Sequence, residues 1–546
     1  MANYGAKILN NAVGSLSAQQ AIIAATSNNI ANVNTAGYAR RSLELQTRVS
    51  SGASTGLDVG NGVEVAQIRR VVDNFIEGLL RTAGGDAASA EIQNDFTKRV
   101  DSLFSLTADG GITIGSRLSQ FFSSLNDLAA NPASIELRQN VLARANDLAS
   151  SIQATYRELA TLQDEADQRI SDELNAVNGL AAQIAAVNQV IASREGGSGQ
   201  VAADERDRRD VLLQQLSEKI GVQIVNLSDG TVNVTLKNGF ALVSGSTARS
   251  LEFSRSPSFA GGSTPPSLSG GTLGYIVYDY SAGAGSAHVD LTQTIAAEGG
   301  LIGGLLAVRG FNAATSTSAF EGSGFLVEVA SRVESIARQL LVSFNDTYLG
   351  ADENPALVGR QASSTDLDGN VPGSTYAFFG ATGLTDIDGD GNPELSDLAA
   401  SGIDSFARRL SVMVTDPRRV AAGRDLDPVQ AQIGSAQGDG TNARALADLQ
   451  TAQLVFSVGS HSFTGTFEQA YNEALGHVGN ASSSAELNER VSSQNLTTAR
   501  NRRDEVSGVS LDEEFTSLIK FQKAYEASAR MIKVAQDLLD QVLSIL

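Results

Sequence analysis

The chain of 546 residues contains no cysteine, no tryptophan and only three histidines. The lack of cysteine excludes a disulfide scaffold, a zinc–thiolate site and a cysteine nucleophile. No segment approaches the ~18 apolar residues that a membrane-spanning helix needs, so membrane insertion is not expected. The first residues carry one lysine, Lys7, and a short apolar core at residues 21–25, which makes a poor signal peptide. We therefore expect that any export of this chain proceeds without a cleaved hydrophobic signal.

Positive charge is scarce as well. The chain has 61 acidic and 40 basic residues, which gives a formal net charge of −21. Such a surface repels nucleic acids and anionic membranes, so neither is an expected partner. The hydrophobic content of 42% is ample for globular cores, and the length predicts roughly three to four domains.

Catalytic motifs are missing too. The sequence contains no Walker A loop, no H-E-x-x-H, no G-x-S-x-G and no G-x-G-x-x-G that opens a helix. We interpret His461 and His477 as surface residues, and the charged cluster at 204–210 as the solvated face of a helix at 206–220. The chain is therefore not expected to be an enzyme.

One acidic loop has the spacing of a metal site. Asp386, Asp388 and Asp390 stand at positions 1, 3 and 5, glycine follows at position 6, and Asp397 stands at position 12. Alternating carboxylates before such a glycine are typical of a Ca²⁺ loop. The last carboxylate is shorter than the usual glutamate, and no clear helix precedes the loop. A Ca²⁺ site is one interpretation, and an acidic turn without metal is the other.

The last stretch, residues 510–546, predicts one uninterrupted helix. Ser510 and Glu513 form a capping box at its start, and neither glycine nor proline follows. Apolar residues then recur at spacings of four and three, which indicates a coiled-coil-like face that needs a partner. The subunit-interface residues predicted here are Leu511, Phe515, Leu518, Phe521, Tyr525, Ile532, Leu539 and Leu543.

The first 31 residues repeat that spacing and carry no charge from Lys7 to Arg40. We expect the two terminal helices to pair with each other and with those of neighbouring copies. The corresponding interface residues are Leu9, Val13, Leu16, Ile23 and Ile30.

Between the ends, the pattern predicts helices and then strands. A very long helix is expected over 134–195, with a break possible near Gly179 because glycine costs about 1 kcal/mol relative to alanine in a helix. Strands of period two with two Asp/Asn-Gly turns are expected over 222–243, and a tight hairpin is expected around residues 60–62. Further helices are expected over 442–450 and 463–475.

These elements predict an α+β multidomain fold, in which paired terminal helices form a coiled-coil-like stem and the middle of the chain supplies insertions. The expected domains are a terminal coiled-coil domain, a helical rod-like bundle with a β-hairpin, and outer β-rich modules. Their boundaries are 1–35 with 507–546 for the first, 36–225 with 295–350 and 440–506 for the second, and 226–294 with 351–439 for the third.

Two short segments resemble a known family. Residues 27–40 read Ser-Asn-Asn-Ile-Ala-Asn-Val-Asn-Thr-Ala-Gly-Tyr-Ala-Arg, and residues 521–530 read Phe-Gln-Lys-Ala-Tyr-Glu-Ala-Ser-Ala-Arg. Both resemble the signatures of the flagellar rod, hook and hook-associated axial proteins. The Phe521-Gln522 pair is similar to the hook-associated branch, because rod and hook proteins usually carry Ala-Gln there. The resemblance is weak over roughly 245–290 and 355–435.

This resemblance implies a structural flagellar protein at the junction of hook and filament, arranged as a ring of identical subunits outside the cell. It also implies the hook protein, a second junction hook-associated protein, a cognate export chaperone and the flagellar type III export apparatus as partners. Two alternatives stay open, namely another axial subunit of the distal rod or hook and a secreted Ca²⁺-binding adhesin or enzyme.

Overall fold

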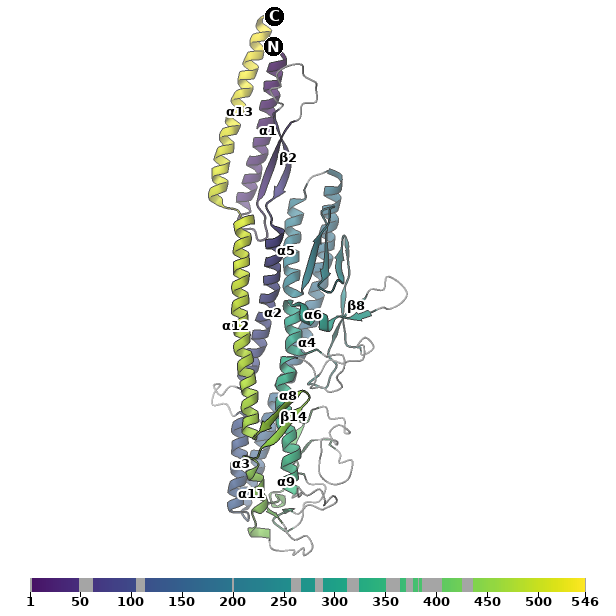
Figure 1. Cartoon of the computed structure of the whole chain (residues 1–546), viewed down its shortest axis with the longest axis vertical. Coiled ribbons are helices and arrows are strands. Elements are labelled where there is room, and N and C mark those ends of the chain that lie inside the picture. The colour runs from purple at the N-terminus through teal and green to yellow at the C-terminus, as the bar shows by residue number, and fades with distance from the viewer. Residues whose placement is uncertain are drawn as a thin grey trace.

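The computed structural model describes residues 2–48, 62–104, 113–198, 201–256, 267–279, 288–311, 324–349, 364–369, 377–381, 383–384, 405–424 and 436–545. The molecule is a long rod with both chain ends at the same tip (Figure 1). Helix α1 (Ala2–Ala31) and helix α13 (Leu511–Ile545) form that tip. The rest of the rod is a helical body with small sheets on one flank.

Long helices build the body, which is held by one continuous apolar core. Helix α4 runs for 64 residues without a break at Gly179, where an added Cβ would meet no atom within 4 Å. The helix continues through the glycine, so the break considered possible there is absent. The core side chains of α4 include Leu148, Ile152, Leu159, Ile170, Leu174 and Ile184. The other long helices are α2 (Asn74–Phe104), α3 (Ile114–Ala130), α4 (Ile135–Ser198), α5 (Ala203–Lys219) and α12 (Phe467–Ser507).

The first hairpin differs from the prediction in its partner strand. Strand β2 (Val63–Arg70) pairs antiparallel with β1 (Arg41–Thr47), and Val63 lies opposite Thr47. The strand that would precede residues 60–62 in the predicted hairpin falls within 49–61, outside the described residues. The domain prediction grouped this hairpin with the helical region, and in the structure it lies along α1 (Figure 1).

The predicted meander after α5 is confirmed. Its two turns place Gly230 and Gly239 at φ of 82° and 93°, and in each turn the glycine N–H donates to the carbonyl three residues earlier, as in a three-residue hairpin loop with a G1 bulge. Both outer sheets contact the side of α4. One has the order β3 (Val222–Asn226), β4 (Val232–Leu236), β5 (Ala241–Ser244), β6 (Thr247–Ala248), and the other β7 (Leu251–Ser254), β8 (Tyr275–Asp279), β9 (His288–Asp290).

The far end of the rod combines short helices with two small sheets. Phe121 of α3 packs against Phe344, Phe378 and Phe379, with ring centroids 5.4–6.1 Å apart, so aromatic burial holds these pieces together. Helices α6 (Thr292–Glu298) and α7 (Gly300–Arg309) lie midway along the rod, where α6 is beside β8 and α7 packs on α2 and α4 (Figure 1). Nearer the far end lie α8 (Phe325–Gln339), η2 (Leu340–Phe344), α9 (Asn345–Leu349), η4 (Pro417–Arg419), η5 (Ala436–Gly438) and α11 (Thr441–Asp448). The paired strands are β10 (Ser364–Thr365) with β13 (Gly423–Arg424) and β11 (Phe379–Ala381) with β12 (Leu410–Val412).

A second hairpin replaces the start of a predicted helix. Residues 463–465 belong to strand β15 (His461–Gly465), which pairs with β14 (Leu454–Val458). Thr466 then caps α12 through a capping box with Gln469, so the helix begins at Phe467 and the prediction was wrong before that residue. The alternating apolar residues of 454–463 carry this strand signal.

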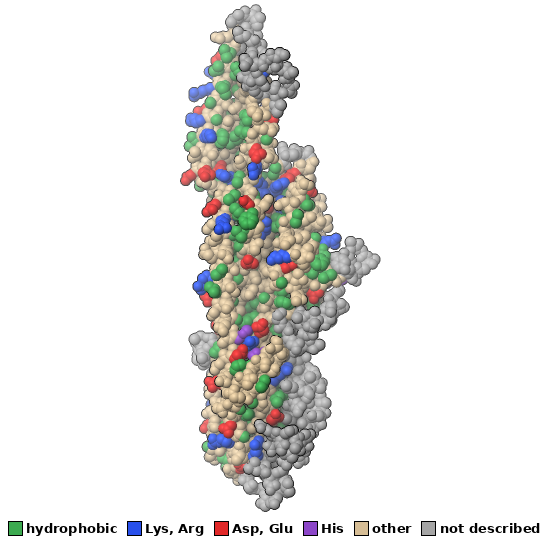
Figure 2. Space-filling view, viewed as in Figure 1, with side chains coloured by type: hydrophobic (Ala, Val, Ile, Leu, Met, Phe, Trp, Pro, Cys, Tyr) green, Lys and Arg blue, Asp and Glu red, His purple; other side chains and the backbone are tan. Residues whose placement is uncertain are grey.

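The two histidines interpreted as surface residues instead lie in a joint between this hairpin, α8 and α12. The His461 side chain is only 10% exposed and its Nε2 lies 3.9 Å from Glu473 Oε2. His477 Nε2 lies 3.3 Å from Glu328 Oε2, and its ring stacks on Phe325. Figure 2 shows histidine side chains grouped with acidic and basic ones on this part of the rod.

This joint predicts a pH dependence. Burial lowers the pKa of His461 from its ordinary value of 6.5, Arg332 and His477 lower it further, and Glu473 opposes them. The neutral ring is therefore favoured in the fold, so its stabilising contribution is present above pH 6.5 and is lost as the pH falls below it. Hydrogen exchange of the β14–β15 amides, corrected for intrinsic rates, should show protection that falls between about pH 7.5 and 5.5. In His461→Gln that fall should be smaller, and an equal fall would contradict the assignment.

Candidate assembly interface

The terminal helices pair antiparallel, as three contacts along their length show. Ser15 Oγ lies 3.0 Å from Ser528 Oγ, and Gln20 Nε2 donates to Tyr525 Oη at 3.5 Å. Further along, Asn29 Nδ2 donates to Glu514 Oε2 at 3.1 Å. Partner numbers fall along α13 as they rise along α1, and the predicted pairing of the two ends is confirmed.

Helix α1 lies between α13 on one side and the β1–β2 hairpin on the other. Its glycine at position 14 permits the hairpin to approach, since an added Cβ would lie 3.0 Å from the carbonyl oxygen of Val63. Burial therefore centres one residue away from the predicted row. The most buried side chains are Ala12, Ala18, Ile22, Thr26 and Asn29. The predicted Leu9, Leu16, Ile23 and Ile30 are half-buried, and Val13 is exposed.

The contact row of α13 keeps the four-three spacing but contains polar and small residues. Glu514, Ser528 and Ala535 are its most buried members. The predicted Leu518, Phe521, Tyr525 and Ile532 are half-buried within or beside this row, whereas Leu511 and Phe515 are exposed. The side chains of the predicted Leu539 and Leu543 lie outside the described part of the structure.

An outer face of α13 remains uncovered in the single chain. Ile519 and Val534 are 60% and 56% exposed, and neither contacts the apolar core of the body. Figure 2 shows green side chains along the upper part of the rod, where α1 and α13 lie. Exposed apolar residues gathered on one element are typical of an interaction surface. The exposed apolar residues of α13 are Leu511, Phe515, Ile519, Met531, Val534 and Leu538.

The Asn-rich segment that follows α1 fixes the base of the pair. Asn29 is buried, and its Oδ1 accepts from Tyr38 Oη at 2.7 Å and from the backbone N–H of Arg41 at 3.0 Å. Its Nδ2 donates to the carbonyl of Arg41 and to Glu514. Burial raises the pKa of Tyr38 to about 12, so the hydroxyl keeps its proton and donates. These side chains hold a turn and are not a catalytic group.

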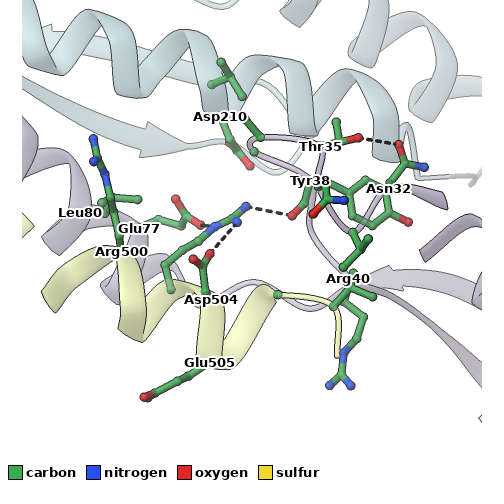
Figure 3. Close-up of a pocket in the computed structure, with 18 of the residues that line it drawn as sticks. Asn32, Thr35, Tyr38, Arg40, Glu77, Leu80, Asp210, Arg500, Asp504 and Glu505 are labelled. Carbon is green, nitrogen blue, oxygen red and sulfur yellow. Dashed lines mark hydrogen bonds and ion pairs between the residues drawn. The ribbon is translucent and has the colours of Figure 1, made fainter. Parts of the chain in front are cut away.

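A cavity of about 790 Å³ lies beside this segment, between the end of α12 and the start of α13 (Figure 3). Arg503 reaches across one wall, where Nη2 donates to the Tyr38 carbonyl at 3.0 Å and Nε lies 3.5 Å from Glu77 Oε1. The backbone N–H of Arg40 donates to the Ser507 carbonyl at 2.9 Å. The α12–α13 turn is thus tied to the N-terminal loop by directional polar contacts.

The charged cluster at 204–210 also lies at the base of the terminal pair, and its interpretation as a solvated face was wrong for the buried Asp207 and Arg209, whereas Asp204 and Arg208 are exposed. Asp207 is 9% exposed, accepts from Arg70 Nε at 2.8 Å and lies 3.5 Å from Arg41 Nη2. Burial raises the pKa of Asp207, and Arg70 opposes that shift. The arginines come from the ends of β1 and β2, more than a hundred residues away, so sequence spacing gave no signal of the contact.

Gly37 takes a positive φ of 78°, which glycine adopts readily, and the structure shows a second reason for glycine. An added Cβ would lie 2.1 Å from Val211 Cγ2 of α5. The loop therefore packs directly against the helical body at a point where no side chain fits.

A pair of glycine substitutions tests this packing. Gly37→Ala should lower the free energy of unfolding by about 1–3 kcal/mol, because it combines a strained backbone with a steric overlap. Gly179→Ala is the matched control and should be neutral or stabilise by up to about 1 kcal/mol, since its surroundings are open. Differential scanning calorimetry compares the two, and equal melting temperatures for Gly37→Ala and the unmodified protein would contradict the close packing.

The acidic loop with Asp386, Asp388, Asp390 and Asp397 lies outside the described residues, so the calcium interpretation stays a prediction. Within the described residues there is no group of three or more His, Cys, Asp or Glu residues arranged to hold a metal ion. Among the helices that the structure describes, none combines the length and apolar character needed to span a bilayer.

Comparison with known proteins agrees with this architecture. Residues 97–359 match the family of the flagellar hook-associated protein FlgK helical domain. Residues 9–38 match the flagella basal body rod protein family, and residues 500–545 match the C-terminal family of the flagellar basal body rod FlgEFG proteins. The last two matches cover the two terminal helices.

Full-length relatives match as well. The chain is 28% identical to flagellar hook-associated protein 1 of Salmonella typhimurium, over 98% of this chain and 99% of the relative. It is 27% identical to that protein of Escherichia coli and 24% identical to that of Bacillus subtilis, again over 98% of this chain. The solved hook junction protein FlgK from Burkholderia pseudomallei shares the fold, with a TM-score of 0.58 and 16% identity over 78% of this chain and 100% of that one.

The paired terminal helices with their two signature segments define an axial protein of the bacterial flagellum, of the rod and hook type. The match of residues 97–359 and the full-length relatives narrow the assignment to one family of axial proteins. The chain belongs to the flagellar hook-associated protein 1 family.

Proposed function

We propose that this chain is the structural subunit that joins the hook to the filament, and that it assembles through its terminal helices into a ring of identical subunits. The observation that carries this proposal is the α1–α13 pair, which buries one side of each helix and leaves large apolar residues of α13 exposed. Burial of such residues against neighbouring copies stabilises an assembly by the hydrophobic effect.

Membership in a structural family supports the assembly role and offers no support for an enzyme. The helical domain at 97–359 and the full-length relatives favour the hook-associated junction over a distal rod or hook subunit. No contact of the described residues favours a calcium-dependent adhesin.

The partners of such a subunit are its own copies, the hook protein and a second junction hook-associated protein. We further propose export through the flagellar type III apparatus to a position outside the cell, with a cognate chaperone bound to the C-terminal helix before assembly. The exposed apolar face of α13 supports this chaperone, since it needs cover until neighbouring subunits arrive.

Deletion of the gene tests the junction role. Negative-stain electron microscopy should show hooks without filaments, and flagellin monomers should accumulate in the medium. The absence of hooks would indicate a rod or hook subunit instead. Normal filaments would reject the axial role altogether.

Charge on the outer face of α13 tests the assembly surface. Ile519→Asp and Val534→Asp should complement the deletion strain poorly, with filaments reduced at least about tenfold, because each buries a charge in the assembled interface. Both side chains are exposed in the single chain, so circular dichroism should be unchanged. Gln494→Asp on an exposed part of α12 is the matched control and should restore filaments.

Leu518→Asp changes a residue in the α1–α13 contact and should disrupt the pair itself. Hydrogen exchange should then rise in α1 and α13 while the helical body stays protected. If Leu518→Asp or Val534→Asp completes filaments normally, the terminal helices are not the assembly element.

The calcium interpretation has its own test. Isothermal titration of the full-length chain with Ca²⁺ should give a millimolar or tighter site that Asp388→Ala removes. The lack of heat in the unmodified chain would leave the acidic turn as the correct interpretation.

A further inference from the structure

A group of exposed apolar side chains lies where the terminal hairpin meets the helical body, on the opposite side of α1 from α13. Ile68 of β2 and Leu227 after β3 line a second cavity, of about 700 Å³, and Asn74 at the start of α2 forms part of its wall. Val225 of β3 lines an adjoining cavity of about 400 Å³, which Asn74 also lines. The side chains of Ile68, Leu227 and Val225 are 45%, 39% and 51% exposed, so large apolar groups remain uncovered around the first turn of α2.

Phe75 is the most exposed member of this group, at 77%, and no other large hydrophobic side chain in the described part of the chain is as exposed. It belongs neither to the core of the body nor to the small apolar cluster that α2 forms with α12. Asp73 caps the first turn of α2, because its Oδ1 accepts from the backbone N–H groups of Phe75 at 2.8 Å and Ile76 at 3.4 Å. The ring is thus presented from a fixed helix end, and its burial would remove roughly 150 Å² of apolar surface from water. We name Ile68, Phe75, Val225 and Leu227 the hairpin-side patch.

The base of α13 lies at the same level of the rod, on the other side of α2. Glu77 of α2 lines the cavity of about 790 Å³ together with Ser510 and Glu513 at the start of α13. Glu77 also lines the second cavity, together with Ile68 and Asn74. The first turns of α2 therefore separate the start of α13 from the hairpin-side patch. Figure 1 shows α13 at one edge of the rod and β2 with the outer sheets toward the other.

The start of α13 carries its own exposed apolar row. Leu511, Phe515 and Ile519 follow one another at a spacing of four, which places them along one side of the helix, and they are 41%, 49% and 60% exposed. Copies that are related by rotation about an axis along the rod keep every residue at its level. Each copy of a ring then meets its two neighbours through two different surfaces, one on each flank. The α13 row and the hairpin-side patch meet both conditions, because they share a level and lie on opposite flanks.

We propose that the α13 row of one copy packs on the hairpin-side patch of the next copy, with Phe75 as the anchor, an inference that rests on the proposed self-assembly. Three large apolar side chains from one copy and four from the next are then buried together. Buried aromatic anchors carry much of the binding energy of such contacts. The contact runs head to tail, because its two surfaces differ, and head-to-tail contacts close into rings or continue as helices. It also explains why Phe75 stays uncovered in the single chain.

Cysteine cross-linking tests the contact directly, since the chain has no cysteine of its own. Asn74→Cys and Thr516→Cys place one exposed thiol beside each surface. Flagella from the deletion strain that produces the double variant should, after mild oxidation, give a ladder of multimers on a non-reducing gel. Co-production of the two single variants should give dimers without a ladder, which excludes a link within one chain. Asn74→Cys combined with Gln494→Cys on α12 is the control and should give no ladder.

Filament formation in the complemented deletion strain tests the anchor. Phe75→Asp should restore at least about tenfold fewer filaments than the unmodified gene, because a charge replaces an aromatic side chain in the buried contact. Phe75→Leu should retain part of the function. Val455→Asp changes a 57% exposed valine of β14, in another part of the rod, and is the matched control that should restore filaments. Circular dichroism should be unchanged in Phe75→Asp and Val455→Asp, since both side chains are exposed.

The two experiments together identify the occupant of the hairpin-side patch. If Phe75→Asp completes filaments normally, the contact is overturned, whereas the proposed function stands as long as Ile519→Asp still fails. If Phe75→Asp fails but the cysteines at 74 and 516 do not cross-link, another protein such as the hook protein covers the patch and the second copy is rejected. Normal filaments in the deletion strain itself would reject the proposed function, whatever the cross-linking shows.

Discussion

The buried amide of Asn29 joins three parts of the molecule that are remote in sequence. It donates to Glu514 of α13 and to the carbonyl of Arg41, and it accepts from Tyr38 and from the N–H of Arg41. Every hydrogen-bonding position of this side chain is used, and its loss would remove a donor from the buried Glu514 carboxylate and leave Asn28 as the remaining acceptor of the Tyr38 hydroxyl. The direction in which the terminal pair leaves the helical body depends on this arrangement together with the polar contacts of Arg503, Arg70 and Arg41, because the pair shares no apolar core with that body.

The polar contacts at the base of the terminal pair and the exposed apolar face of α13 have different physical consequences. Hydrogen bonds and ion pairs from Arg503, Arg70 and Arg41 are directional, so they fix an angle without covering the outer face of α13. If α13 were held by apolar packing instead, its large apolar residues would be buried within the single chain and would not be exposed to neighbouring subunits. The body, in contrast, is held by a continuous core along α4, which gives it a stiffness that does not depend on assembly.

Periodicity and turn residues predicted the helices and strands well, but they could not predict contacts between residues that lie far apart in the sequence. The α4 helix, the meander with Gly230 and Gly239, and the pairing of the two ends follow from periodicity and turn chemistry. The burial of Asp207 does not, since Arg70 and Arg41 reach it from strands that no spacing rule connects to α5. The contacts of His461 with Glu473 and of His477 with Glu328 were not predicted for the same reason. The buried row of α1 was off by one residue because the β1–β2 hairpin, as well as α13, covers that helix.

The residues that make contacts inside the terminal pair differ in character from those of α13 that remain exposed for assembly. Within the pair, small and polar residues combine with half-buried apolar ones such as Leu518 and Ile532, and a hydrogen bond such as Ser15–Ser528 contributes about 1 kcal/mol net. The outer face of α13 carries large apolar side chains such as Ile519 and Val534, and burial of half of such a side chain contributes on the order of 1 kcal/mol. The single chain therefore sets the geometry of its terminal helices, and the uncovered face of α13 leaves apolar area whose burial against neighbouring copies would stabilise them further.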